Sequence, residues 1–236
     1  MRVTPNSTTE QFVLRLQTLN EKLLKSADQI STGQKLTNPS DDPTAVGRVF
    51  SMQSDQRKLE QYQSNIDRAE EVSTVTYSHI DSIKDFIVRA EELATGIDDL
   101  TNPEEFTALA LEINQLLEQA VQTGNAQHRG QYLFSGNATD TEPYTVVRDT
   151  AGNITAVTFS GSTSVSSFEV SDGMTLSPYS SNTQNQELLG IMNHLMQLRD
   201  AMTANDVTAV NTIRTDLAND EDLIINQISS HAAIQS

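Results

Sequence analysis

The sequence predicts a mainly α-helical fold with a β insertion: an elongated antiparallel helical rod with coiled-coil-like packing, plus a small β subdomain. Both ends of the 236-residue chain carry apolar residues at alternating steps of three and four, which is the helical period. Between these ends the period falls to two, and Thr and Ser become frequent. We therefore expect an N-terminal arm and turn (1–42), an N-terminal part of the rod (43–130), the β subdomain (131–180) and a C-terminal part of the rod (181–236).

Charge and composition exclude several classes of protein. The chain has 15 Lys and Arg against 32 Asp and Glu, a net charge of −17, and no cluster of basic residues. Such a chain repels phosphate backbones and anionic lipid surfaces, so we expect no nucleic acid and no membrane among its partners. The absence of cysteine excludes disulfides and thiolate sites. The N-terminus lacks the apolar region of a Sec-type signal peptide.

A narrow amphipathic stripe predicts the first helix. Its positions step by four and three, with Ser26 filling one of them, and the apolar ones are Phe12, Leu16, Leu19, Leu23 and Ile30. Gly33 ends this helix, and a turn follows at Asn38, Pro39, Ser40, Asp41, Asp42 and Pro43. In that turn Asp42 is the expected N-cap and Pro43 the first residue of the next helix. We interpret the stripe as an assembly interface between molecules, because its natural partner helix is not found in the sequence; intramolecular core is the alternative.

The second helix carries the longest seam of the sequence. Its positions keep the three–four alternation without a slip, and only Ser73 and Thr76 are polar: Leu59, Tyr62, Ile66, Ala69, Ser73, Thr76, Ile80, Ile83, Ile87, Ala90, Ala94 and Ile97. No proline interrupts residues 44–102. Each buried Ile contributes roughly 1.5–3 kcal/mol, so partner helices must cover this seam. We take Leu59, Tyr62, Ile66, Ile80, Ile83, Ile87 and Ile97 as core of the rod.

Helix and strand signals alternate in the rest of the chain. Asn102 as N-cap and Pro103 at the first position begin a third helix, which we expect to stop at Gly124. Residues 131–134 read as a short strand ending at Gly136. A hairpin is predicted from 144–147 and 154–159, and further strand with a turn at 172–173. Helix returns near Gln184, and we expect the sequence to stop within a helix.

No catalytic or metal-binding pattern emerges from the sequence. The four histidines, His79, His128, His194 and His231, show no pair at metal-ligand spacing. The pairs Asp41-Asp42 and Asp98-Asp99 lack the alternating oxygen ligands and distal Glu of a calcium loop. We therefore expect neither catalytic residues nor cofactors, and we interpret the β segment as a solvent-facing decoration.

Two motifs resemble a known family. Residues 30–43 read ISTGQKLTNPSDDP, which resembles the signature near the N-terminus of bacterial flagellins and their junction relatives. Residues 130–136 read GQYLFSG and look like the hook-associated protein 3 family of the flagellin superfamily; the motif positions are Gly130, Tyr132, Leu133, Phe134 and Gly136. In that family a C-terminal segment pairs with the N-terminal helix to build an inner tube, and we expect that stretch to be missing here.

The resemblance implies a structural protein of the bacterial flagellum that is not an enzyme. Such a protein is exported through the flagellar type III apparatus with an export chaperone, and it resides outside the cell. It forms a homo-oligomeric ring that joins the hook-side hook-associated junction protein to flagellin, and the turn at 37–43 acts as a conformational joint. Filament flagellin itself is the alternative, because it shares the rod and the Gly-Pro break. An enzyme carried on a helical scaffold is a third hypothesis, which the short β segment without His/Glu metal spacing disfavours.

Overall fold

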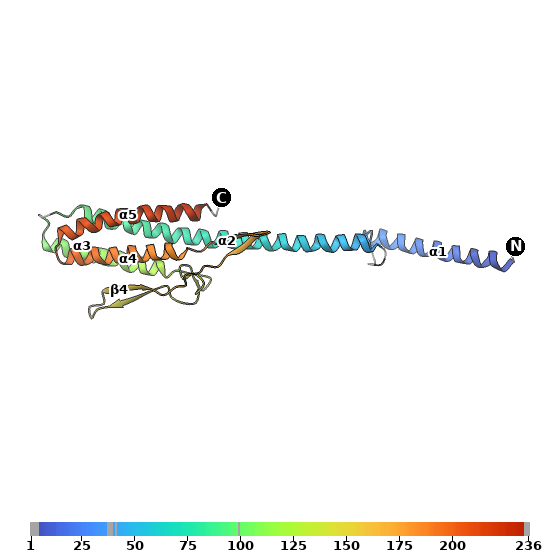
Figure 1. The fold of residues 1–236 in the computed structure, drawn as a ribbon, viewed down its shortest axis with the longest axis horizontal. Helices are drawn as coiled ribbons and strands as arrows, with labels where there is room; N and C mark the ends of the chain where they lie inside the picture. Colours follow the sequence, from blue (N-terminus) through green and yellow to red (C-terminus); the bar gives the residue numbers. More distant parts are fainter. Residues whose placement is uncertain (1–4, 37–39, 41, 99, 234–236) are drawn as a thin grey trace. The chain divides into compact units, whose positions relative to one another are not determined.

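The computed structural model describes residues 5–36, 40, 42–98 and 100–233, and the chain divides into two compact units, Met1–Glu60 and Gln61–Ser236 (Figure 1). The predicted mainly α-helical fold with a small β part is confirmed. The elements in chain order are α1 (Pro5–Thr32), α2 (Pro43–Thr95), α3 (Pro103–Gly124), β1 (Gln127–His128), β2 (Gln131–Tyr132), β3 (Tyr144–Arg148), β4 (Ile154–Phe159), β5 (Phe168–Ser171), β6 (Met174–Leu176), α4 (Asn182–Thr203) and α5 (Val207–Ala232).

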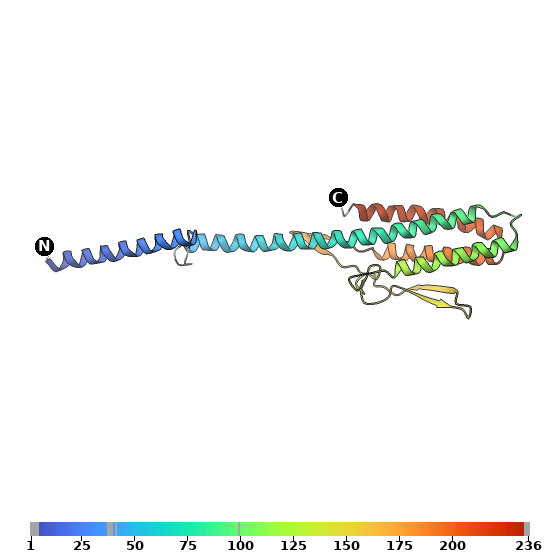
Figure 2. The same cartoon turned by 180° about the vertical axis from the view of Figure 1, so that it is seen from behind.

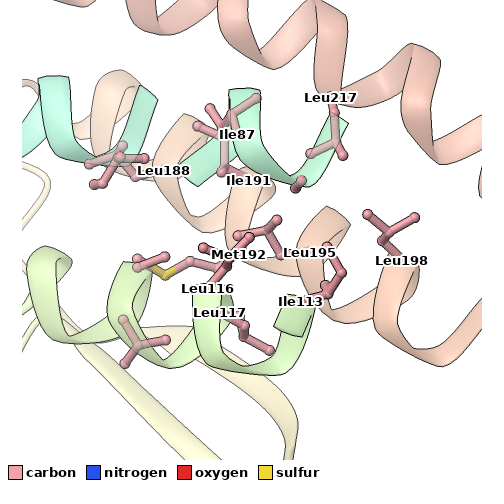
Figure 3. Close-up of a cluster of buried hydrophobic side chains, with 14 of the residues drawn as sticks. Ile87, Ile113, Leu116, Leu117, Leu188, Ile191, Met192, Leu195, Leu198 and Leu217 are labelled. Carbon is pink, nitrogen blue, oxygen red and sulfur yellow. The ribbon is translucent and has the colours of Figure 1, made fainter. Parts of the chain in front are cut away.

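Four helical segments form the core of the second unit. The part of α2 beyond residue 60 lies beside α3, α4 and α5 in both views of the ribbon (Figures 1 and 2). Apolar side chains of all four segments meet at the centre of this bundle, as the close-up in Figure 3 shows. The residues that meet there are Ile87 of α2, Ile113, Leu116 and Leu117 of α3, Leu188, Ile191, Met192, Leu195 and Leu198 of α4, and Leu217 of α5.

The long seam of α2 is buried only over its C-terminal part. Ile80, Ile83, Ile87 and Ile97 are buried, as predicted. The core assignment of the earlier positions is wrong: Leu59 is 66% exposed and Ile66 40% exposed, and Tyr62 is only half-buried. An apolar seam is buried only where another helix covers it. Continuous burial begins at Ala69, close to Ser73, whose hydroxyl donates to the His231 carbonyl of α5 over 3.1 Å.

Side-chain caps begin each of the helices α3, α4 and α5. The Asn102 carboxamide oxygen accepts from the Glu105 N–H over 2.9 Å, which confirms the predicted cap of α3. Ser181 and Gln184 form a reciprocal capping box at the start of α4, and Asp206 accepts from the Ala209 N–H at the start of α5. Gly124 ends α3 as predicted, but for a packing reason. A Cβ there would lie 2.7 Å from the Met192 methyl and 2.8 Å from the Tyr144 ring.

The β part consists of three separate two-stranded antiparallel sheets. The predicted hairpin is confirmed as β3 paired with β4, and the predicted turn at 172–173 joins β5 to β6. The prediction of one strand over 131–134 is wrong. Only Gln131 and Tyr132 pair, with the unpredicted strand β1, and Leu133 and Phe134 leave the ladder to enter the core.

Polar side chains attach the β part to the bundle. Asn125 follows α3 and exchanges two hydrogen bonds with the backbone of Tyr144, 2.9 Å from its N–H and 2.7 Å to its carbonyl. The buried Tyr144 hydroxyl donates to the Asn185 carbonyl of α4 over 2.9 Å, and burial raises the pKa of this phenol. Arg199 interrupts the apolar stripe of α4 and is nevertheless buried, because its guanidinium donates to the Ile154 carbonyl and to the Asn114 side chain.

Truncation of Leu117 tests the bundle core. This side chain is fully buried on α3, so Leu117→Ala should lower the free energy of unfolding by about 2–5 kcal/mol. Leu111, on the same helix, is 62% exposed, and Leu111→Ala is the matched control with an expected change within about 0.5 kcal/mol. Urea denaturation followed by circular dichroism measures both changes; equal losses would contradict the packing of α3.

Candidate assembly surface

The predicted interface residues lie on α1 and are all exposed. Phe12, Leu16, Leu19, Leu23 and Ile30 keep between 51% and 84% of their surface in solvent. At about 100° per residue these five positions fall within an arc of about 60°, so they form one continuous apolar stripe. Burial of each such side chain contributes roughly 1.5–3 kcal/mol, so a partner that covers the stripe gains a large free energy. The structure therefore presents the stripe as a surface available for binding.

Further apolar side chains of the first unit were missed by the sequence analysis. Val13 and Leu24 flank the stripe on one side of α1, and both are exposed. On α2, Val49 and Met52 are exposed as well, and Leu59, which was predicted as core, follows seven residues after Met52 and is also exposed. This spacing was the signal that could have revealed them, because it continues the helical period upstream of the long seam.

The charge of α1 is balanced. The helix contains Arg15, Lys22 and Lys25 against Glu10, Glu21 and Asp28. Two copies of α1 therefore approach each other without net repulsion, unlike two copies of the whole chain with its net charge of −17. The charge of α1 therefore does not oppose packing of its apolar stripe against another helix.

The predicted joint is described only in part. Gly33 adopts the left-handed conformation, with φ at 67°, and its N–H donates to the Gln29 carbonyl over 2.9 Å. Asp42 caps α2 as predicted, because its carboxylate accepts from the Ala45 N–H over 3.0 Å, and Pro43 is the first helical residue. Ser40 lies in an exposed turn. The remaining predicted positions, Asn38, Pro39 and Asp41, lie outside the described residues.

The motif at 130–136 forms a tight connection between α3 and the β part. Arg129 and Gly130 are both left-handed, with φ at 52° and 78°, which is the requirement of a two-residue type I′ hairpin turn. The Tyr132 N–H donates to the Thr139 carbonyl over 2.9 Å, while Leu133 and Phe134 are buried. Gly136 is left-handed at 63°, and a Cβ there would lie 2.6 Å from the Ser164 carbonyl oxygen.

The pKa values of two histidines, the partly buried His194 and the buried His231, are shifted in opposite directions. His194 Nδ1 lies 2.6 Å from the Asp220 carboxylate, and this hydrogen bond raises the pKa of His194. Burial alone lowers the pKa of His231, whose ring nitrogens have no hydrogen-bond partner among the described residues. His194 links α4 to α5 through Asp220, and His231 is buried on α5. Protonation of either ring therefore changes the free energy of unfolding.

The described residues contain no cluster of three or more His, Asp or Glu side chains that could hold a metal ion. None of the helices in that part of the chain is long and apolar enough to cross a membrane. The first unit does have an exposed apolar stripe on α1, and a stripe of this kind can bind another helix by packing.

Comparison with known proteins gives a consistent family. The family model described as the bacterial flagellin N-terminal helical region matches residues 4–139, more than half of the chain. A protein named Flagellar hook-associated protein 3 from Salmonella typhimurium is 25% identical over 146 residues, which are 61% of this chain and 46% of that protein. The protein of the same name from Escherichia coli is 27% identical over 123 residues, 51% of this chain and 39% of that protein. The matched region thus spans less than half of these curated relatives.

Solved structures share the fold. Bacillus cereus FlgL superposes with a TM-score of 0.66 at 22% identity, covering 80% of this chain and 90% of that one. Xanthomonas campestris FlgL superposes with a TM-score of 0.66 at 11% identity, covering 77% and 91%. At these identities the likeness establishes the fold.

Gly136→Ala tests the tight connection. The new methyl group overlaps the Ser164 carbonyl, and the left-handed backbone disfavours any side chain. Gly130→Ala is the matched control, because Gly130 is also left-handed but has open space around it. We expect Gly136→Ala to lower the free energy of unfolding by roughly 1–3 kcal/mol more than Gly130→Ala, measured by urea denaturation. Similar losses for the two variants would refute the steric argument.

His194→Gln tests the ion pair with Asp220. Because the folded-state pKa of His194 is raised, its stabilisation is fully present below the unfolded pKa of about 6.5 and is lost as the pH rises through the folded pKa. Gln keeps a donor for Asp220 without a charge. The difference in free energy of unfolding between wild type and variant should therefore be larger at pH 5.5 than at pH 8.5. A difference that grows with pH would show that the pair is not charged in the folded protein.

Proposed function

Because the chain belongs to the bacterial flagellin N-terminal helical region family, we propose that it is a structural component of the bacterial flagellum. Within the flagellum we propose the role of a junction adaptor, which joins the hook-side hook-associated junction protein to the flagellin filament. The names of the curated relatives support this role. The protein acts by binding and performs no catalytic turnover.

The exposed stripe of α1 carries the proposal. Five apolar side chains on one face of a charge-balanced helix have their binding surface uncovered in the first unit. A chain that assembles with copies of itself needs such a surface, because burial of the stripe supplies the free energy of association. Copies of the chain accordingly form a ring through α1, and the segment around Gly33 lets α1 change direction on assembly.

Filament flagellin is the second candidate function. The matching family model describes flagellin itself, and it covers the helices that both kinds of protein share. The motif at 130–136 and the NPSDDP sequence at 38–43 favour the junction role, since both resemble the hook-associated protein 3 family.

Location and export follow from the same proposal. The protein lies outside the cell, in the flagellum, and reaches it through the flagellar type III apparatus with an export chaperone. The sequence supports this route because it has no cysteine to cross-link in transit.

Gold labelling of intact flagella separates the two functions. An antibody against the β part, residues 131–178, should place gold at the boundary between hook and filament for a junction adaptor. Label along the whole filament would establish flagellin instead. Intact flagella without label, with the epitope shown to be accessible on the purified protein, would exclude both functions.

Leu19→Asp tests the stripe. The carboxylate enters the contact between molecules, so the variant should fail to assemble while its circular dichroism spectrum and unfolding midpoint stay unchanged. Gln17→Asp is the matched control: it adds the same charge about 200° away around α1, outside the stripe, and should assemble normally. Unfolding of the whole second unit by Leu19→Asp would mean that the stripe is intramolecular core.

A further inference from the structure

The second unit is strongly acidic, and most of its few cations are already neutralised. Residues 61–236 contain seven Lys and Arg against 25 Asp and Glu. Arg89 pairs with Glu112 and Glu92, and Arg148 pairs with Glu118. Arg199 is buried against Asp200, and Arg214 interacts with Glu91. Copies of this unit therefore repel one another over most of their surface.

One cleft of the second unit gathers positive charge. Arg68 and Arg129 line it together with His128 and a single carboxylate, Glu71. Lys84 is on α2 as well, but it lies about 20 Å further along the helix from Glu71. The cleft is therefore a local positive site on an acidic body, and we call it the Arg68–Arg129 cleft. Its remaining wall is formed by Val72, Gln131, Leu133 and Tyr179.

The fold holds the cations of this cleft in place. Glu71 accepts from the Arg129 guanidinium over 2.6 Å and lies 3.1 Å from His128 Nε2. The type I′ turn at Arg129 and Gly130 projects the arginine from the end of a short hairpin, where 68% of its side chain remains exposed. Arg68 stacks on the Phe168 ring, 5.3 Å from its centroid, and has no carboxylate within ion-pair distance among the described residues. One carboxylate thus balances only part of the charge.

We propose that the Arg68–Arg129 cleft receives a carboxylate side chain from the acidic second unit of a neighbouring copy of this chain. The inference rests on the proposed assembly of copies side by side. A guanidinium forms strong, directional hydrogen bonds with a carboxylate, and the apolar wall of Val72 and Leu133 reduces the screening of that contact by water. The cleft of one copy and an acidic face of the next are different surfaces. Their contact is therefore head-to-tail, which is the kind of interface that closes into rings.

Packing through the α1 stripe does not involve the motif at 130–136. The proposed contact gives this motif a role, which is to position Arg129. Gly130 allows the turn that presents Arg129, and Leu133 anchors the same hairpin in the core. The stripe of α1 supplies apolar association, and the cleft supplies an orientation between otherwise repelling bodies.

Zero-length cross-linking of Arg129→Lys tests the proposal. The substitution keeps the charge and adds an amine that a carbodiimide couples to a contacting carboxylate, taking up the water lost from the new amide. The full-length variant is mixed with isotope-labelled copies of itself, so that mass spectrometry separates links between chains from links within one chain. We expect a link between chains from Lys at position 129 to an Asp or Glu of residues 61–236. Its yield should fall several-fold between about 0.1 M and about 1 M salt, as the screening length falls from about 10 Å to about 3 Å.

Two further variants make the outcome decisive. Arg89→Lys is the matched control, because Arg89 pairs with Glu112 and Glu92 of its own chain and should give links within one chain only. Adding Arg68→Gln to Arg129→Lys should reduce the yield between chains while the link to Glu71 persists, which shows that the fold is intact.

The readout separates this inference from the proposed function. If Lys22 or Lys25 of α1 forms links between chains but position 129 links only to Glu71, the cleft proposal is overturned and assembly through α1 stands. If the full-length variant neither associates in solution nor forms links between chains, self-assembly and the cleft proposal fall together.

Discussion

The apolar seam shared by α2, α3, α4 and α5 holds the second unit together, and the position of every other element depends on it. Ile87, Leu117 and Leu195 approach one another from three helices at its centre (Figure 3). Because this seam fixes the spacing of α3 and α4, Tyr144 reaches the Asn185 carbonyl and the hairpin of β3 and β4 is attached to the bundle. Each sheet of the β part has only two strands and would be marginally stable alone. Buried hydrogen bonds to the helices therefore hold the β part in position.

The same sequence pattern has two different consequences in the two units. In the second unit the three–four alternation is covered by neighbouring helices and becomes core. In the first unit the stripe from Phe12 to Ile30 keeps most of its surface in solvent, and this exposure supports the proposed assembly through α1. The same apolar residue types form a buried seam and an exposed one. Whether such a seam becomes core or a binding face therefore depends on whether another helix of the same chain covers it.

Charge is distributed in a way that suits these two roles. The helix α1 is balanced and can meet copies of itself, whereas residues 61–236 carry a large excess of carboxylates. Apolar contact through the stripe is indifferent to direction, but repulsion between acidic bodies is strongest where carboxylates face each other. In the proposed contact between copies, the Arg68–Arg129 cleft favours one arrangement of neighbours over the others, so that association and orientation come from different parts of the chain.

The helices, the caps at Asp42 and Asn102 and the hairpin of β3 and β4 could be predicted from the sequence, because all of these depend on residues close together in the chain. Its two motifs also identified the family. The part of the α2 seam that is buried depends on which helices pack against it, because periodicity predicts an apolar face but not what covers that face. Leu59 and Ile66 are exposed for that reason. The pairing of Glu71 with Arg129 could not be predicted either. The two residues lie on different elements far apart in sequence, and only the packing of the core against α2 brings them together.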